Sequence, residues 1–207
     1  MAQKKTEFLA TWDQDQLKPW VDRGVDKAIK RAVKFAGRDA LRTLNTEAAR
    51  YVKSRKKIKA GRISKAMKKI NATGSEIRNM EWRLRVTGKQ TPMSYYPHSK
   101  TRGKTASLRV AINVGKKANL GRAFVARMTN VANSGEVSTH DGIFVRTSKK
   151  RFPIKELFST KVTDPFFDKG ATPEMLHKSM VTFSATFDRV FPRLLAGEKL
   201  GVKKSTT

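Results

Sequence analysis

The side chains best suited to acid–base or metal chemistry are three histidines, and their spacing indicates neither role. His98, His140 and His177 are far apart, and none has a second histidine at the four-residue spacing that places two metal ligands on one helix face. Asp141 follows His140 directly, but we place this pair in a turn, where adjacent side chains rarely face each other. The chain has no cysteine and no Gly-x-Ser-x-Gly motif. We therefore predict no catalytic residue, no metal site and no cofactor.

Carboxylates that could hold the metal ions of a nuclease are missing where a sheet is expected. No Asp or Glu occurs between Trp82 and Gly135, whereas a metal-dependent nuclease needs clustered carboxylates. The glycines that precede Lys89 and Lys116 lack the second glycine and the spacing of a phosphate-binding loop. We predict that the protein is not an enzyme.

Lysine and arginine form the pattern that does indicate chemistry, namely contact with a polyanion. The run from Arg50 to Ile70 contains no acidic residue. It is either a solvated surface screened by salt or a surface that meets phosphates or an acidic protein. A second basic group lies in the segment from Gly88 to Ala106, and we expect its neutralisation to flatten the salt dependence of DNA binding. The candidate contacts to DNA or to an acidic partner are Lys53, Arg55, Lys56, Lys57, Lys59, Arg62, Lys100, Arg102 and Lys104.

The composition agrees with an acidic partner. The 207 residues carry a formal net charge of +28, and the pI is about 10.8, far beyond what solubility requires. No run of about eighteen apolar residues occurs, and the N-terminus lacks the apolar core of a signal peptide. We expect synthesis in the cytoplasm and no membrane contact.

Helices are predicted on both sides of the strands, and the basic run lies in the first part of the chain that forms them. Apolar residues recur every three or four positions from Val21 to Val52, which predicts a long amphipathic helix that extends to about Arg55, with a bend or break conceivable at Gly37. A basic helix is predicted from about Ile58 to Ile70. A last helix is predicted from Thr172, and Pro192 should kink it or end it.

Strands are predicted between these helices. Alternating apolar residues indicate strands at 82–86, 108–114, 123–130 and 142–147, joined as an antiparallel meander, with a long basic loop at 88–106. The phenylalanines of this region and of the last helix are predicted to pack in the core. The fold class is α+β, with both long helices packed on a small, mostly antiparallel sheet of about four strands. The organisation is an N-terminal extension (1–18), one domain (19–196) and a flexible basic tail (197–207).

Three segments, in their order along the chain, suggest a family. They are the basic helix end at Val52–Arg62, the sequence Gly-Arg-Ala-Phe-Val-Ala-Arg at Gly121–Arg127, and Lys-Lys-Arg-Phe-Pro-Ile at Lys149–Ile154. Over about residues 40–195 this order resembles the minor tail protein Z family, the tail completion proteins of lambda-type tailed phages. The N-terminal extension and the interruption of the basic loop by Tyr-Tyr-Pro at 95–97 depart from the family's pattern.

The resemblance implies a structural virion protein at the head-proximal end of the tail, in the neck, where it enables head–tail joining. Its expected partners are further copies of itself in a six-fold ring, the tail terminator or tail tube protein, and the head connector or neck proteins. The end of the packaged DNA would lie in or near the ring. The alternative from another class is a nonspecific nucleic-acid-binding protein, which the charge supports equally well.

Overall fold

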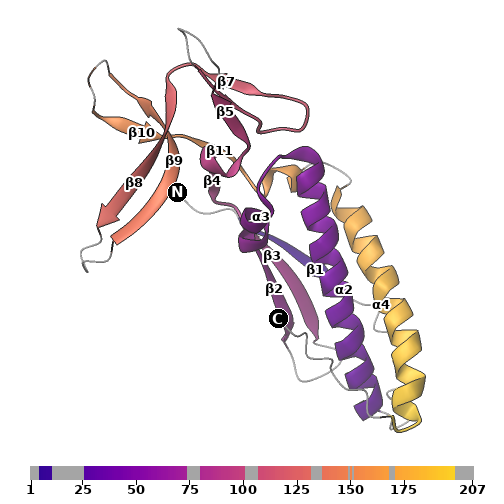
Figure 1. Cartoon of the computed structure of the whole chain (residues 1–207). Helices are drawn as coiled ribbons and strands as arrows, with labels where there is room; N and C mark the ends of the chain where they lie inside the picture. Colours follow the sequence, from indigo (N-terminus) through magenta and orange to yellow (C-terminus); the bar gives the residue numbers. More distant parts are fainter. Residues whose placement is uncertain are drawn as a thin grey trace. The chain divides into compact units, whose positions relative to one another are not determined.

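The computed structural model describes residues 5–10, 26–73, 80–100, 107–131, 137–148, 150, 152–167 and 171–198. Its helices are α2 (Asp26–Arg55), α3 (Ala60–Ala66) and α4 (Ala171–Leu195), which Figure 1 shows together with the strands. Every strand pair with a described register is antiparallel. The predicted α+β class is therefore confirmed. The chain divides into two compact units, which we call the helical unit and the sheet unit.

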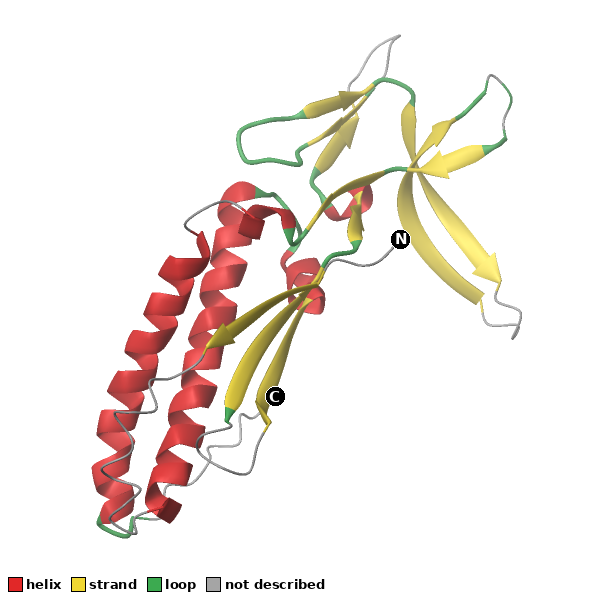
Figure 2. Ribbon diagram, turned by 180° about the vertical axis from the view of Figure 1, so that it is seen from behind, coloured by secondary structure: helices red, strands yellow, loops and turns green. Residues whose placement is uncertain are grey.

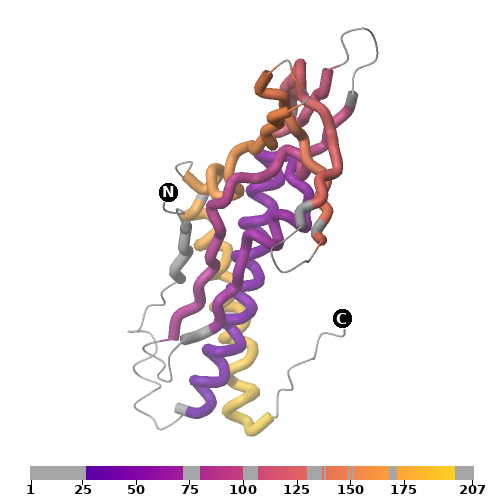
Figure 3. The backbone as a smooth tube through the Cα atoms, turned by 90° about the vertical axis from the view of Figure 1, so that its left-hand side faces the viewer, coloured from indigo at the N-terminus to yellow at the C-terminus, as the bar shows by residue number. Residues whose placement is uncertain are grey.

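The helical unit consists of residues 6–48, 67–85 and 169–207. Its sheet has the strand order β1-β3-β2, formed by β1 (Lys5–Ala10), β2 (Met67–Thr73) and β3 (Glu81–Thr87). Part of the predicted N-terminal extension therefore belongs to a sheet, as β1. Figures 2 and 3 show α2 and α4 side by side, next to this sheet.

The apolar stripe of α2 forms the core of the helical unit. Eight apolar side chains of the part of α2 that belongs to this unit are buried, and they are Ile29, Ala32, Val33, Ala36, Ala40, Leu41, Leu44 and Ala48. The helix runs unbroken through Gly37, and the reason lies in β3. A Cβ at Gly37 would lie 2.2 Å from Cε2 of Trp82, so glycine is the only residue that lets the indole lie directly on the helix backbone. Burial of Trp82 thus outweighs the helix propensity lost at Gly37.

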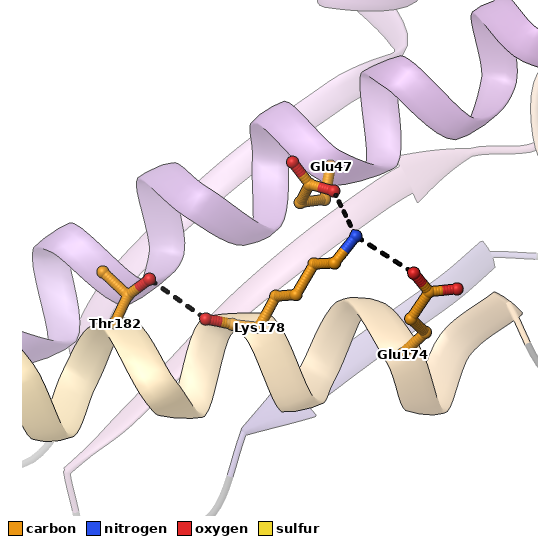
Figure 4. A network of polar contacts seen from close by, with 4 residues as sticks. All are labelled: Glu47, Glu174, Lys178 and Thr182. Carbon is orange, nitrogen blue, oxygen red and sulfur yellow. Dashed lines mark hydrogen bonds and ion pairs between the residues drawn. The ribbon is translucent and has the colours of Figure 1, made fainter.

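Helix α4 lies along α2, and polar contacts join the two helices. The buried hydroxyl of Ser179 donates to the backbone oxygen of Ala40 over 3.0 Å. The Lys178 Nζ lies 3.2 Å from a Glu47 oxygen on α2 and 3.0 Å from a Glu174 oxygen on its own helix, as Figure 4 shows. These hydrogen bonds, to Glu174 first and then to Glu47, raise the pKa of Lys178 above its ordinary value.

The prediction of a basic helix as far as Ile70 was wrong at its end. Helix α3 stops at Ala66, and Met67–Thr73 is strand β2. Ile63, Met67 and Ile70 have helical spacing, but the chain gains more by pairing with β3 in the sheet than by continuing the helix. Local periodicity is a weaker determinant here than strand pairing.

Pro192 does not end α4, which continues to Leu195. The helix stops where Gly197 adopts a left-handed φ of 82°, with the N–H groups of Gly197 and Glu198 donating to the carbonyls of Leu194 and Arg193. This is the C-terminal capping pattern that glycine favours. The predicted flexible tail from residue 199 onward lies outside the described residues.

The sheet unit consists of residues 1–5, 49–66 and 86–168. It holds three small sheets, ordered β10-β9-β8, β11-β4 and β5-β6-β7. The strands are β4 (Gln90–Pro92), β5 (His98–Lys100), β6 (Leu108–Val110), β7 (Ala118–Leu120), β8 (Ala123–Val131), β9 (Val137–Arg146), β10 (Ile154–Glu156) and β11 (Phe158–Lys161). The described part of this unit also contains the short 3₁₀ helices η2 (Met93–Tyr95) and η3 (Asp164–Phe167).

Several details of the sheet unit differ from the sequence prediction. The strand expected at 108–114 ends at Val110, and part of the long loop forms β4, η2 and β5. The strands do not make one meander, because they are distributed among separate sheets. Phe152, Phe158 and Phe167 are exposed, although core positions were predicted for them. These three lie outside or at the ends of short elements, where periodicity gives no information about burial.

Candidate polyanion-binding surface

The basic residues predicted to meet a polyanion lie where α2 ends and α3 begins. Lys53 and Arg55 are in the last turn of α2, where positive charge is favourable at the negative end of the helix dipole. Lys56, Lys57 and Lys59 follow in the connection, and Arg62 lies on α3. The side chains of Lys53, Arg55, Lys57 and Lys59 are exposed, and those of Lys56 and Arg62 are half-buried.

Backbone hydrogen bonds fix the course of this connection. Lys57 donates to Ile112 over 3.0 Å, Val114 donates to Arg55 over 3.2 Å, and Lys59 donates to Tyr95 over 3.0 Å. Ile58 is buried within the connection. Because the main chain is held on both sides of its buried residue, the cationic side chains are presented from a fixed backbone.

Aromatic rings support two of the arginines. The Arg55 guanidinium carbon lies 5.6 Å from the centre of the Tyr51 ring, which itself stacks on Phe166 at 6.1 Å. The Arg62 guanidinium lies 5.5 Å from the Tyr95 ring, and its Nη2 donates to Gln90 over 3.5 Å. Such cation–π contacts limit the rotamers of an arginine. The ring of Tyr51 thus limits the orientation of Arg55, which is exposed. Arg62 is half-buried and uses part of its guanidinium for contacts within the protein.

A cleft of about 620 Å³ opens beside Arg55, and we call it the basic cleft. Asp164 also lines it, but Oδ2 of this carboxylate accepts a hydrogen bond from the Lys161 N–H over 2.8 Å. The cleft is lined by three cationic side chains, Arg55, Lys56 and Lys116, and by one acidic side chain, Asp164. The complete lining is Ser54, Arg55, Lys56, Asn113, Val114, Lys116, Asp164 and Pro165.

Lys116 and Asn113 are members of this cleft that sequence reasoning missed. Gly115, the glycine before Lys116, lies in a turn and has a left-handed φ of 80°. What could not be inferred is that this turn lies against the end of α2, through the pairing of Asn113 with Lys56. The signal available in the sequence was the Gly-Lys-Lys triplet at 115–117, which adds cations without any acidic residue nearby.

The cations of the predicted basic loop are placed less completely. Lys100 ends β5, which pairs with β6. Arg102 and Lys104 lie outside the described residues, so their part in the surface stays a prediction.

A second hollow, of about 720 Å³, brings together His98 and His140, which lie far apart in the sequence. We call it the histidine pocket. It is lined by Lys59, Pro92, Ser94, Tyr95, His98, Val125, His140, Asp141 and Glu156. His98 Nδ1 lies 2.9 Å from the Tyr96 carbonyl oxygen. In the neutral ring this contact requires the proton on Nδ1, which leaves Nε2 as an acceptor.

His140 and Asp141 lie in strand β9 and not in the predicted turn. His140 Nε2 is 3.6 Å from Oε2 of Glu156. Asp141 binds Arg127 on the neighbouring strand over 2.8 and 3.2 Å. The hydrogen bond from Arg127 lowers the pKa of Asp141, and the charges of His140 and Lys59 contribute to the same direction. His140 and Asp141 thus have different partners, so they do not form an oriented base.

Metal binding and membrane insertion find no support in the described residues. They contain no group of three or more histidines, aspartates or glutamates arranged to hold a metal ion. None of the helices described is both long and apolar enough to cross a membrane. Comparisons of the chain with protein-family models, with curated proteins and with solved structures find no match.

Proposed function

We propose that the protein is a structural protein of a phage virion, a tail completion or neck protein. It would form a ring at the head-proximal end of the tail and enable head–tail joining. The observation that supports the DNA-contact part of this proposal is the basic surface, a set of cations on a fixed backbone beside a cleft. The motif order that resembles the minor tail protein Z family supports the placement in the tail.

The chemistry of the basic cleft supports contact with DNA phosphates. Three cations and the side chains of Ser54 and Asn113 line a space open to solvent. Phosphate oxygens accept hydrogen bonds from such groups without regard to base sequence. A protein near the path of packaged DNA needs this kind of contact, because every sequence of the genome end must be tolerated.

The DNA contact is tested by the salt dependence of binding. We compare a triple variant of the cleft, Arg55→Gln/Lys56→Gln/Lys116→Gln, with a control of equal charge on the exposed face of α2, Lys27→Gln/Lys34→Gln/Arg38→Gln. The slope of log affinity against log salt should fall by roughly 0.9 for each phosphate that the cleft variant no longer neutralises, and it should change less in the control. Equal slopes in the two variants would show that DNA does not bind in the cleft.

The tail function is tested by assembly. The purified protein is measured by light scattering and negative-stain imaging, alone and mixed with tails that lack it. A ring that appears on the tail end supports the proposal. A protein that ignores tails but coats DNA is the nonspecific nucleic-acid-binding protein of the alternative, which the same basic surface would equally serve.

A further inference from the structure

Strands β8 and β9 form a hairpin that pairs with a further described strand over only a short part of its length. The two strands pair along all nine residues of β8. Strand β10 pairs only with Phe144, Val145 and Arg146 of β9. In the described chain, no strand pairs with the outer edge of β8. The hairpin beyond Ile143 is therefore a two-stranded ribbon (Figure 1).

Both faces of this ribbon carry exposed side chains, although His140 and Asp141 also line the histidine pocket. Arg127 and Asp141 face each other on one side and are exposed, while His140, opposite Met128, is exposed on the other. Val137, near the tip, is 65% exposed. An isolated two-stranded hairpin has marginal stability in water. Contact with another chain would therefore stabilise the ribbon.

The outer edge of β8 has few of the features that prevent strand pairing. Natural edge strands are commonly protected by lysine, proline or a bulge. Residues 123–131 contain neither lysine nor proline. Their one charged side chain, Arg127, is paired with Asp141 of β9, and the pairing of the two strands shows no register shift. The row of backbone groups on this edge is thus available for a further strand.

The distribution of charge along the sequence indicates which kind of partner can approach this edge. The chain has a formal net charge of +28, yet the segment 123–146 contains only Arg127 and Arg146 against Glu136 and Asp141. Two copies of so basic a protein repel each other except where charge is balanced. DNA or an acidic protein, in contrast, would be drawn to the basic surface. The neutral ribbon is the place where a second copy can approach at the lowest electrostatic cost.

We propose that the outer edge of β8 pairs with an extended segment of a second copy of this chain. This inference names the contact for the self-association contained in the proposed function, and to that extent it rests on it. The contact consists of backbone hydrogen bonds along β8, with the exposed residues of the ribbon covered at the same time.

The test is the mass of the full-length protein by light scattering, over a range of concentrations and at salt from about 0.1 to 1 M, because salt screens repulsion between copies. The wild-type protein should associate more strongly as salt rises. Thr129→Lys adds a charge to the exposed side of β8, and the control Thr160→Lys adds the same charge on exposed β11. Thr129→Lys should weaken association about tenfold relative to the control.

Proline at two successive positions tests the edge itself. The N–H groups of Met128 and Thr129 point to opposite edges of β8. Only one of Met128→Pro and Thr129→Pro therefore interrupts the pairing with β9, and circular dichroism and thermal unfolding identify it. The other variant should keep its fold and associate about tenfold or more weakly, as expected when one backbone hydrogen bond is removed.

Two results would overturn the inference. One is a wild-type protein that remains monomeric at every salt concentration, and the other is a folded edge variant that associates like the wild type. Neither result changes the salt slope of DNA binding or the attachment to tails. Failure of this contact can therefore be distinguished from failure of the proposed function.

Discussion

Buried hydroxyl groups distinguish the helical unit from the sheet unit. In the helical unit, Ser179 is buried and its hydroxyl donates to Ala40. In the sheet unit, Thr91, Tyr96 and Thr163 are 0% exposed, and their hydroxyl oxygens have no hydrogen-bond partner among the described residues. The basic cleft and the histidine pocket both lie in the sheet unit. The described part of the sheet unit thus contains buried hydroxyl groups that its fold does not satisfy, and both clefts lie in the same unit.

The largest effect should come from a methyl group added to the helical unit. In Gly37→Ala the new Cβ would lie within 2.5 Å of three ring atoms of buried Trp82. We expect a loss of about 3 kcal/mol in the free energy of unfolding, because a buried indole has little room to move. Urea unfolding measures it.

Gly61→Ala is the control for this substitution in the sheet unit. Gly61 also lies in a helix, but no heavy atom lies within 4 Å of its Cβ position. Higher helix propensity should stabilise this variant by about 0.5 to 1 kcal/mol. Equal effects at the two glycines would contradict the tight packing of Trp82 on α2.

The second-largest effect should come from the removal of buried hydroxyl groups. The resulting change in the free energy of unfolding should have opposite signs in the two units. Ser179→Ala removes a satisfied hydrogen bond and leaves the Ala40 carbonyl without it, so we expect a loss of about 1 kcal/mol. Tyr96→Phe removes a buried hydroxyl without a partner in the described chain and should gain about 1 kcal/mol. Both are measured by thermal and urea unfolding. A loss of stability in Tyr96→Phe would mean that its hydroxyl is bonded.

The smallest effect is the alkaline sensitivity of the helical unit. The pKa of Lys178 is raised in the folded protein by Glu174 and Glu47, so the stabilisation is present below the ordinary lysine value of 10.5 and is lost as the pH rises through the raised pKa. Lys178→Met should lower the Tm at pH 8 by on the order of 1 to 2 °C. The difference from wild type should shrink at alkaline pH. Lys34→Met, an exposed lysine of α2, is the control and should show neither change.

Sequence reasoning succeeded where a single periodicity decided the structure. The stripe of α2 and the alternation of β3 each report burial on one face, and both were predicted correctly. The region 88–100 was not, because β4, η2 and β5 are too short to show a period.

The site was predictable only in part, for a related reason. The cations at 53–62 are close together in the sequence, so a common basic surface could be predicted from it. Lys116 joins them through a pairing between residues 56 and 113. The histidine pocket needs five strands, the 3₁₀ helix η2 and the connection between α2 and α3 to come together. Such long-range contacts leave no local pattern.

The contact between Gly37 and Trp82 also has a consequence for evolution. Where the indole lies on the helix backbone, the two positions cannot change independently. Homologous chains with a side chain at position 37 should have a smaller residue at position 82, and those with tryptophan at 82 should keep glycine at 37. This covariation offers a criterion for recognising distant relatives whose surface charges have diverged.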